Sequence, residues 1–339
     1  MSEEEEKEFP EQEQEQDLYE HYRFVVDPRQ GLLRIDKFLT SRMENTSRTR
    51  IQAAANAGNI LVNDAPVKPN YRVKPSDIIQ IVLPNPPREI ELIPQDIPIN
   101  IVYEDDDVIV VNKKAGMVVH PAYGNYTGTL INALMFHFKD LPLFQSGDLR
   151  PGLVHRIDKN TSGLLVIAKN EYAMNRLARQ FYNRTTGRRY LALVWGTPEP
   201  EEGTVTGNVG RNIRDRKIMQ VFPDGSQGKH AVTHYTVIEK FSYVSLLECR
   251  LETGRTHQIR VHMSYIGHPL FNDGEYGGDR ILKGTTFSKY QQFVRNCFEI
   301  LPRQALHAKS LAFDHPVTGK RLSFDSELPD DMQQAIEKW

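Results

Sequence analysis

The stretch "RPGLVHRIDKNTSGLLVIAK", residues 150–169, has two unlike halves. Its first half brings together an imidazole, a guanidinium and a carboxylate: His155, Arg156 and Asp158. Turn residues 161–163 then lead into the apolar run 164–168, which predicts a buried strand. Asp158 therefore lies just before a turn that enters the core. A lone aspartate beside bases is usually a structural ion-pair partner, so the rest of the chain has to decide its role.

The composition is that of a globular protein without a membrane segment. The chain has 339 residues, enough for two domains or for one large domain with an appendage. No apolar window of about 18 residues is present, and the acidic N-terminus lacks the apolar core of a signal peptide. The two cysteines form no short-spaced pair, which indicates a reducing compartment. We therefore expect a cytoplasmic protein.

The net charge of −2 hides an asymmetry between tail and body. Residues 1–20 carry a net charge of −9, so residues 21–339 carry +7. The acidic stretch has too little apolar surface to offset the entropy of ordering, and residues 1–22 are predicted to be a disordered tail. A basic body is a weak indication of nucleic acid as a partner, and on charge alone a merely solvated surface is the more common explanation.

Residues 23–83 are predicted to form a small domain of two helices followed by two strands. The first helix is expected in "GLLRIDKFLTSRM", and the second opens at Ser47 and closes at Gly58. Short strands are expected in "ILVNDAPV" and "DIIQIVLP", around the turn residues Asn63-Asp64 and 75–77. Between residues 31 and 83 eight Lys/Arg stand against four Asp/Glu. Prolines then mark residues 84–98 as a stiff, extended linker.

Residues 99–335 are predicted to form a larger domain of the α+β class. Strands are expected at 108–111 and 117–119, helices in "TGTLINALMFHF" and "YAMNRLARQFYNR", and further strands in "AVTHYTVIEKFSYVSLLECRLETGR" and "THQIRVHMSYIGH". The order shows no regular βαβ rhythm. A mixed, mainly antiparallel sheet therefore fits better than a doubly wound parallel one.

Several familiar kinds of site find no support in the sequence. No glycine-rich phosphate loop opens a helix, and Gly-x-Ser-x-Gly is absent. His257 and His262 are five residues apart in a predicted strand, which places them on opposite faces, and no Cys-x-x-Cys or His-Glu-x-x-His occurs. We therefore expect neither a metal nor a cofactor.

Two later segments change the interpretation of Asp158. "LETGRTHQIRVHM" supplies Arg255 and Arg260, and "RRYLALV" supplies Tyr190 at the start of a strand. A carboxylate that an arginine keeps ionised can attack or assist at a sugar carbon, while an aromatic ring stacks on a base. The combination indicates chemistry on a nucleoside unit.

At these residues the sequence resembles the bacterial pseudouridine synthases that modify ribosomal and transfer RNA. The resemblance rests on "GLVHRIDKNTSGLLVIAK" and "ETGRTHQIRVHM", and further on "VVNKKAGMVVHP", "RRYLALVWG", "GHPLFNDGEYGG" and "ALHAKSLAFDHPVTG". "LRIDKFL", "SRTRIQ" and "GNILVND" resemble the alpha-L RNA-binding module, first known from a small-subunit ribosomal protein. Together they are most similar to the D-type synthases of the large ribosomal subunit, although residues 279–304 look longer than is usual there.

The resemblance implies a cofactor-free isomerisation of uridine to pseudouridine in structured RNA, with 23S ribosomal RNA as the expected substrate. Asp158 would be the nucleophile, and Tyr190 would stack on the base and serve in proton transfer. Arg255 would pair with Asp158 and lower its pKa, with Arg260 as the weaker candidate for that task. Arg156 would fill the gap left by the flipped uridine. The expected substrate-binding residues are His155, Arg156, Thr161 and Arg260 in the large domain, and Arg34, Lys37, Arg48 and Arg50, with Lys68, in the small one.

Three alternatives stay open. The substrate could be transfer RNA, the protein could be a ribosome-assembly factor without catalysis, or the same aspartate could serve a nucleoside hydrolase that releases the base. The RNA-binding module argues for a polymer substrate and thus against the last. The expected partner is RNA, with no membrane contact, and the chain is expected to be monomeric.

Overall fold

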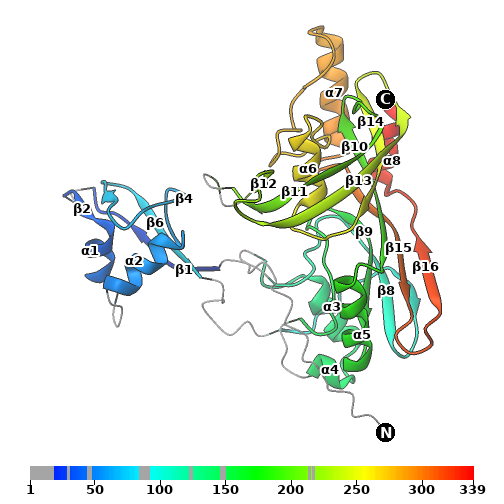
Figure 1. Ribbon diagram of the computed structural model, residues 1–339, viewed down its shortest axis with the longest axis horizontal. Coiled ribbons are helices and arrows are strands. Elements are labelled where there is room, and N and C mark those ends of the chain that lie inside the picture. Colours follow the sequence, from blue (N-terminus) through cyan, green and yellow to red (C-terminus); the bar gives the residue numbers. More distant parts are fainter. Residues whose placement is uncertain are drawn as a thin grey trace. The chain divides into compact units, whose positions relative to one another are not determined.

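The computed structural model describes residues 19–28, 31–43, 48–83, 92–121, 125–145, 150–212, 215 and 218–339. The chain divides into two compact units, residues 1–89 and 90–339, and each is described by itself (Figure 1). The proposed cap Ser47, the tail up to residue 18 and residues 84–91 of the predicted linker lie outside the described residues. Residues 92–98 form neither helix nor strand.

The N-terminal unit contains β1 (Tyr19–Val25), β2 (Leu33–Arg34), α1 (Ile35–Thr40), α2 (Arg48–Asn56), β3 (Ile60–Val62), β4 (Ala65–Pro66), β5 (Arg72–Val73) and β6 (Ile78–Leu83). Antiparallel pairs give the sheet order β1-β6-β3-β4, and β2 pairs with β5. The sheet and both helices share one apolar core that includes Ile35, Phe38, Ile51 and Ile79. β1, which begins at Tyr19, is the first described element of this unit.

Two turns of this unit follow from their sequences. Asn63 and Asp64 both have positive φ, 50° and 65°, and join β3 to β4. Asparagine and aspartate tolerate this left-handed region better than other side chains, so the Asn-Asp pair suits a two-residue hairpin. Gly58, with φ of 73°, follows α2, and its N–H donates to the carbonyl of Ala55. The predicted hairpin turn and the glycine stop are confirmed.

The second unit is built on one large sheet. Its strands are β7 (Ile101–Glu104), β8 (Val108–Lys113), β9 (Ser162–Ala168), β10 (Gly187–Trp195), β11 (Glu202–Arg211), β12 (Met219–Phe222), β13 (Lys229–Lys240), β14 (Val244–Leu251), β15 (Leu306–Asp314) and β16 (Arg321–Asp325). In the described part of the chain they follow the order β12-β11-β13-β14-β10-β15-β9-β8-β7, with β16 on β15. The predicted α+β class with a mainly antiparallel sheet is confirmed.

A short parallel pairing joins the strands β12-β11-β13-β14-β10-β15 of this sheet to the strands β9-β8-β7. β9 and β15 pair only at Ser162 with His307 and at Gly163 with Ala308. Gly163 has φ of +116°, and a Cβ at this position would lie 2.3 Å from the carbonyl oxygen of Ala308. Any side chain would therefore force the strands apart, so glycine is required here. Gly163, five positions after Asp158, thus fixes where the turn that carries Asp158 meets the sheet.

Helices cover both faces of the sheet. They are α3 (Leu130–His137), α4 (Pro142–Gln145), α5 (Glu171–Tyr182), α6 (Gln258–Tyr265), α7 (Ser288–Ile300) and α8 (Asp330–Lys338). α3 and α4 pack on the face of β8 and β9 that carries Ile109 and Leu165, and α5 packs on the opposite face. α7 and α8 share a second core with Trp195 (Figure 1). The segment 279–304 thus contributes α7 to a packed core.

Two predicted strands are wrong. Residues 117–119 form no strand, because the carbonyls of Val118 and Val119 accept the first N–H groups of α3 instead of pairing with a neighbouring strand. The segment "THQIRVHMSYIGH", expected as strand, contains helix α6. Its polar residues alternate with apolar ones, yet Gln258, Arg260 and His262 are all buried. Because each finds polar partners, the helix can be buried on several sides, and the alternation misleads.

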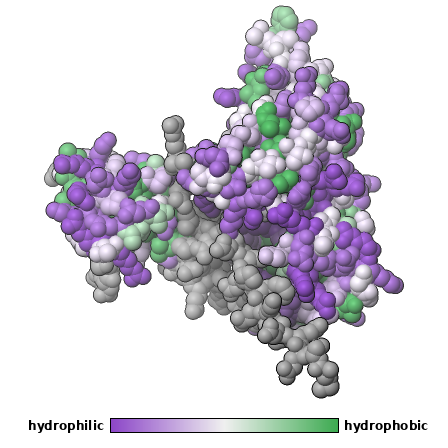
Figure 2. All heavy atoms as spheres, viewed as in Figure 1, coloured by the Kyte–Doolittle hydropathy of each residue, from purple (hydrophilic) through white to green (hydrophobic). Residues whose placement is uncertain are grey.

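The surface of the protein is mainly hydrophilic on the face shown in Figure 2, and both cysteines are buried. On this face, hydrophilic residues dominate both units and hydrophobic residues form only small patches. Within the described residues, no helix combines the length and the apolar content needed to cross a bilayer. Cys249 and Cys297 are both buried and free of a disulfide.

Candidate active site

Asp158 lies on a tight turn whose carbonyl groups are held by buried donors. The N–H of Thr161 donates to the carbonyl of Asp158 at 3.1 Å. The carbonyl of Lys159 accepts from the Nζ of buried Lys113 at 3.0 Å and from the N–H of Gly116 at 2.9 Å. Burial lowers the pKa of Lys113 to about 7, and the nearby Asp158 carboxylate opposes this effect. Lys113 therefore couples the turn to the end of β8.

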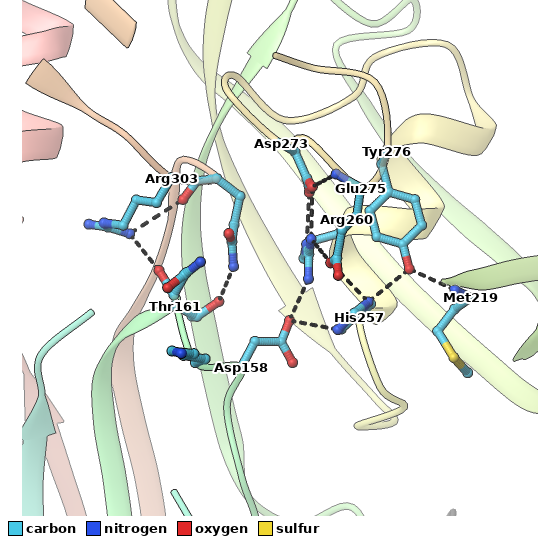
Figure 3. Close-up of polar contacts among 12 residues, drawn as sticks. Asp158, Thr161, Met219, His257, Arg260, Asp273, Glu275, Tyr276 and Arg303 are labelled. Atoms are coloured by element: carbon cyan, nitrogen blue, oxygen red, sulfur yellow. Dashed lines mark hydrogen bonds and ion pairs between the residues drawn. The ribbon is translucent and has the colours of Figure 1, made fainter. Parts of the chain in front are cut away.

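A second buried cation supports the turn from the other side. Arg303 donates through Nη1 to the carbonyl of Asn160 at 3.0 Å, and its Nε and Nη2 bind the carboxylate of Asp331 at 2.7 and 2.8 Å. Gln304 donates to the hydroxyl of Thr161 at 3.4 Å (Figure 3). The start of α8 is thus connected to the residues that directly follow Asp158.

Arg260 on α6 is the arginine that meets Asp158. Its Nη1 donates to Oδ2 of Asp158 at 3.3 Å, while Nε and Nη2 form a bidentate pair with Asp273, both at 2.7 Å. Nη2 also contacts Glu275 (Figure 3). The guanidinium lies 5.0 Å over the ring of Tyr276. The two short bonds to Asp273 fix the orientation of Arg260, so its remaining donor points at Asp158 without depending on it.

The role predicted for Arg255 therefore falls to Arg260. Arg255 precedes α6, its Nε donates to the carbonyl of His230 at 3.2 Å, and its N–H donates to Gln258. The resemblance alone implied Arg255 for this role. Because the segment turns into a helix at Gln258, Arg260 is carried to the aspartate instead. The weaker candidate of the sequence analysis is the one in contact.

His257 is a neighbour of Asp158 that the sequence analysis did not assign to the site. Its Nε2 lies 3.9 Å from Oδ2 of Asp158, and its Nδ1 lies 2.9 Å from the hydroxyl of Tyr276. That hydroxyl accepts from the N–H of Met219 at 2.9 Å, which leaves its own proton to donate to Nδ1. This pattern fits the tautomer with the proton on Nε2, facing the aspartate. His257 has φ of 53°, a strained value for a non-glycine residue and typical of functional sites.

The surroundings of Asp158 keep it ionised. Burial alone would raise its pKa, but the charges of His257, Arg260 and Arg156, with the hydrogen bond from Arg260, hold that pKa below its ordinary value. Burial lowers the pKa of His257, while the nearby Asp158 carboxylate opposes this effect. Both side-chain contacts of Asp158 go to Oδ2, and its carboxylate keeps 17% of its surface exposed.

Tyr190 and Arg188 lie side by side on β10. Tyr190 is buried, and burial raises the pKa of its phenol, with Arg188 lowering it and Asp158 raising it. The phenol therefore stays protonated at neutral pH and lies within the electrostatic reach of Asp158. The sequence placed Tyr190 in the site. Arg188, which it quoted without a role, is its neighbour.

The side chains of His155 and Thr161 both contact other groups of the protein. The His155 Nε2 accepts the N–H of Val166 at 3.0 Å, and its ring stacks on Phe181 at 4.5 Å. Burial lowers the pKa of His155 to about 3, so it is neutral. Thr161 is buried against Gln304. Arg156 is exposed beside Asp158, which suits the role predicted for it.

The expected RNA-binding residues of the N-terminal unit surround a buried carboxylate. Asp36 accepts from Arg34 at 2.9 Å, from Arg48 at 2.9 Å and from Gln52 at 2.8 Å. Arg34 and Arg48 keep nearly half of their side-chain surface exposed, and Lys37, Arg50 and Lys68 are exposed. Asp36, which the sequence analysis did not single out, therefore orients two of the predicted phosphate contacts.

One group of side chains has the composition of a metal site. Asp105, Asp107 and His315 offer ligand atoms within 4.8 Å of one another. Asp105 already accepts from the hydroxyl of Tyr103 at 2.6 Å and lies 2.9 Å from the His315 ring. These contacts account for the group as an internal hydrogen-bond network. None of its members is bonded to the Asp158 cluster.

Comparisons with known proteins agree with this geometry. The family described as RNA pseudouridylate synthase matches residues 107–265, and the S4 domain matches residues 33–79. A protein of Chlorobaculum parvum named uncharacterized RNA pseudouridine synthase is 51% identical over 308 residues, covering 90% of this chain and 94% of that protein. The ribosomal large subunit pseudouridine synthase D of Zymomonas mobilis is 44% identical over 311 residues, covering 88% and 92%.

Among solved structures, human RNA pseudouridylate synthase domain containing 1 aligns with a TM-score of 0.50 and 27% identity, covering 68% of this chain and 84% of that one. The chain therefore belongs to the RNA pseudouridine synthase family, with an S4 domain ahead of its catalytic domain.

Proposed function

We propose that the protein converts particular uridines of large-subunit ribosomal RNA to pseudouridine, with Asp158 as the nucleophile. One observation supports this role above others. Asp158 is held ionised by Arg260, yet both contacts use Oδ2 and the carboxylate stays partly exposed. Within the described residues, Oδ1 is left for a substrate atom. Relatives named ribosomal large subunit pseudouridine synthase D support ribosomal RNA over transfer RNA as the substrate.

The reaction is an isomerisation and balances without another reactant. The Asp158 carboxylate attacks C1′ of the ribose, and the bond from C1′ to N1 of uracil breaks with its electron pair on the base. The base turns so that C5 faces C1′, the C1′–C5 bond forms, and the carboxylate leaves. The proton of C5 is lost and N1 gains one. Since Arg260 is fixed by Asp273, it can stabilise the carboxylate before attack and after release.

Tyr190 would contact the uracil base, and Arg156 would contact the RNA from which the base is flipped. The protonated phenol of Tyr190 can stack on uracil and donate a hydrogen bond, but its raised pKa leaves little phenolate at neutral pH to accept a proton. Arg156 is exposed next to the nucleophile and would occupy the gap in the RNA that the flipped uridine leaves. The S4 domain would add affinity for the phosphate backbone through Arg34, Lys37, Arg48 and Arg50.

The proposal is tested by mapping pseudouridine across the total RNA of cells that lack the gene, and by tritium release from 5-labelled uridine in 23S RNA with the purified protein. We expect a small set of positions in large-subunit RNA to lose pseudouridine and to regain it in vitro. Loss of positions only in transfer RNA would contradict the substrate. Release of free uracil would contradict isomerisation in favour of base hydrolysis.

A further inference from the structure

Arg188 is a half-buried cation without a polar partner. Within the described residues its guanidinium makes no hydrogen bond or ion pair, and its Nε is shielded from solvent and unsatisfied. Its nearest characterised contact is the ring of Phe181, 5.4 Å away. Burial lowers the pKa of Arg188, with the nearby Tyr190 opposing this effect. Among the described residues, the aromatic ring of Phe181 is therefore the contact that offsets the desolvation of the Arg188 charge.

The other buried arginines of the catalytic unit show what is missing. Arg260 is matched by Asp273, and Arg303 is matched by Asp331, each through a bidentate pair. A buried charge is normally paired, because leaving water costs more than a neutral environment returns. Among the described residues, Arg188 has no such carboxylate partner.

The backbone leaves room for this guanidinium. At Gly254, in the segment between β14 and α6, a Cβ would lie 2.8 Å from Nη1 of Arg188. Arg188 also lines a cavity of about 570 Å³, together with the bases Arg189, Arg250 and Arg321 and the acids Glu252 and Asp325.

The spacing to Tyr190 identifies the anion. Arg188 and Tyr190 are two residues apart on β10, so their side chains leave the same face of the strand roughly 7 Å apart. A nucleotide whose base stacks on Tyr190 has its phosphates at a comparable distance from the ring. The planar fork of an arginine matches the oxygens of a phosphodiester.

We propose that Arg188 binds a phosphodiester of the RNA next to the uridine held by Tyr190. This inference rests on the proposed function, since it takes the base at Tyr190 to be the target. It adds a contact on the catalytic unit that is independent of the S4 domain. Asp158 is already compensated by Arg260, so the incoming phosphate meets its counter-charge at Arg188.

The test uses RNA binding by the full chain in the inactive Asp158→Asn background, so that no turnover is needed. Arg188→Met should weaken binding by about 10- to 100-fold, the size expected for hydrogen bonds to a charged group, and should lower the log–log salt slope by about one. Arg188→Lys should keep the salt slope and recover part of the affinity. Arg176→Met is the matched control, because Arg176 also lies over an aromatic ring, 5.2 Å from that of Tyr172, but is exposed.

A neutral substitution in the RNA identifies the contact. Methylphosphonate placed singly at each phosphate flanking the target uridine removes one charge at a time. One position should weaken binding to the arginine protein and have no further effect on Arg188→Met. If the losses are additive at every position, Arg188 binds no phosphate and the inference is wrong. The proposed function fails separately, through wild-type protein that binds this RNA but forms no pseudouridine.

Discussion

Two aspartates, Asp36 in the S4 domain and Asp158 in the catalytic domain, are both held by arginines, and they differ in how completely. The side chain of Asp36 is fully buried and accepts from Arg34, Arg48, Gln52 and the N–H of Lys37. Asp158 keeps 17% of its side-chain surface exposed and accepts one hydrogen bond of 3.3 Å from an arginine that is bound more tightly elsewhere.

The difference separates a structural carboxylate from a reactive one. Four donors around Asp36 leave no lone pair directed at solvent, so a new bond there would first have to break existing ones. At Asp158 the charge is stabilised while one oxygen stays accessible. Both have lowered pKa values, so the pKa alone would not distinguish them. What distinguishes the two carboxylates is the number and strength of the hydrogen bonds that would have to be broken before each could form a new bond.

Replacing each aspartate by asparagine should separate the two roles most strongly. Asp158→Asn should lower the rate of pseudouridine formation by about 10³-fold or more, since an amide cannot act as the nucleophile. RNA binding and the melting temperature should change little. Single-turnover tritium release at saturating RNA measures the rate. Asp36→Asn, as the control, should leave this rate within about threefold. Activity of a few per cent in Asp158→Asn would exclude the nucleophilic role.

Arg260 and Arg255 should differ because, among the contacts of the described residues, Arg260 is the arginine that binds Asp158. Arg260→Gln leaves buried Asp273 without its bidentate partner, which should cost about 3–5 kcal/mol of unfolding free energy, and it should lower the chemical rate by roughly 10²-fold. Arg255→Gln should cost less than about 1 kcal/mol. Urea unfolding and single-turnover kinetics measure both. Equal effects of the two variants would return Arg255 to the role that the sequence predicted.

Asp36→Asn should destabilise the S4 domain by about 1–3 kcal/mol, because Arg34, Arg48 and Gln52 lose a charged acceptor. Hydrogen exchange of the α1 and α2 amides in the full chain reports the loss locally. The amides of β9 and β10 should keep their protection. If exchange is unchanged in the S4 domain, the arginines are solvated without Asp36, and the analogy between the two aspartates is weaker than proposed.

Acid should reduce this last effect. The pKa of Asp36 is lowered from 3.8, because the hydrogen bonds of Gln52, Arg34 and Arg48 outweigh the opposite effect of burial. Its stabilising contribution is therefore fully present above pH 3.8 and is lost as pH falls further. The stability difference between wild type and Asp36→Asn should be constant near neutral pH and shrink below about pH 3.8. A difference that grows in acid would contradict the assigned direction.

Local signals in the sequence were enough for many elements. The Asn63-Asp64 turn, the glycine stop at Gly58 and the apolar run after Asp158 each depend on neighbouring residues only, and each is confirmed. Asp158 and Tyr190 could be placed in one site because their motifs were matched as a set. α6 could not be predicted, since burial of its polar residues depends on partners far away in sequence.

The partners of Asp158 were beyond local reasoning for the same reason. Arg260 contacts an aspartate 102 residues earlier, and the turn beyond that aspartate depends on Arg303, 143 residues after Asn160. The choice between Arg255 and Arg260 required the rotation of a helix that the alternating pattern concealed. The motif "GHPLFNDGEYGG" held the missing signal, because its Asp273 and Glu275 are the acids that orient Arg260.

The parallel pairing between β9 and β15 also means that different parts of the fold can form at different times during synthesis. Ser162 and His307 are bonded neighbours although 145 residues separate them in the chain. At about 5–20 residues per second, a ribosome needs roughly 7–30 s to make that interval. During this time the S4 domain and the strand after the nucleophile already exist, while Arg303 and β15 do not. The chain thus gains its means of holding RNA well before its means of modifying it, and any fragment released early would occupy a substrate without reacting with it.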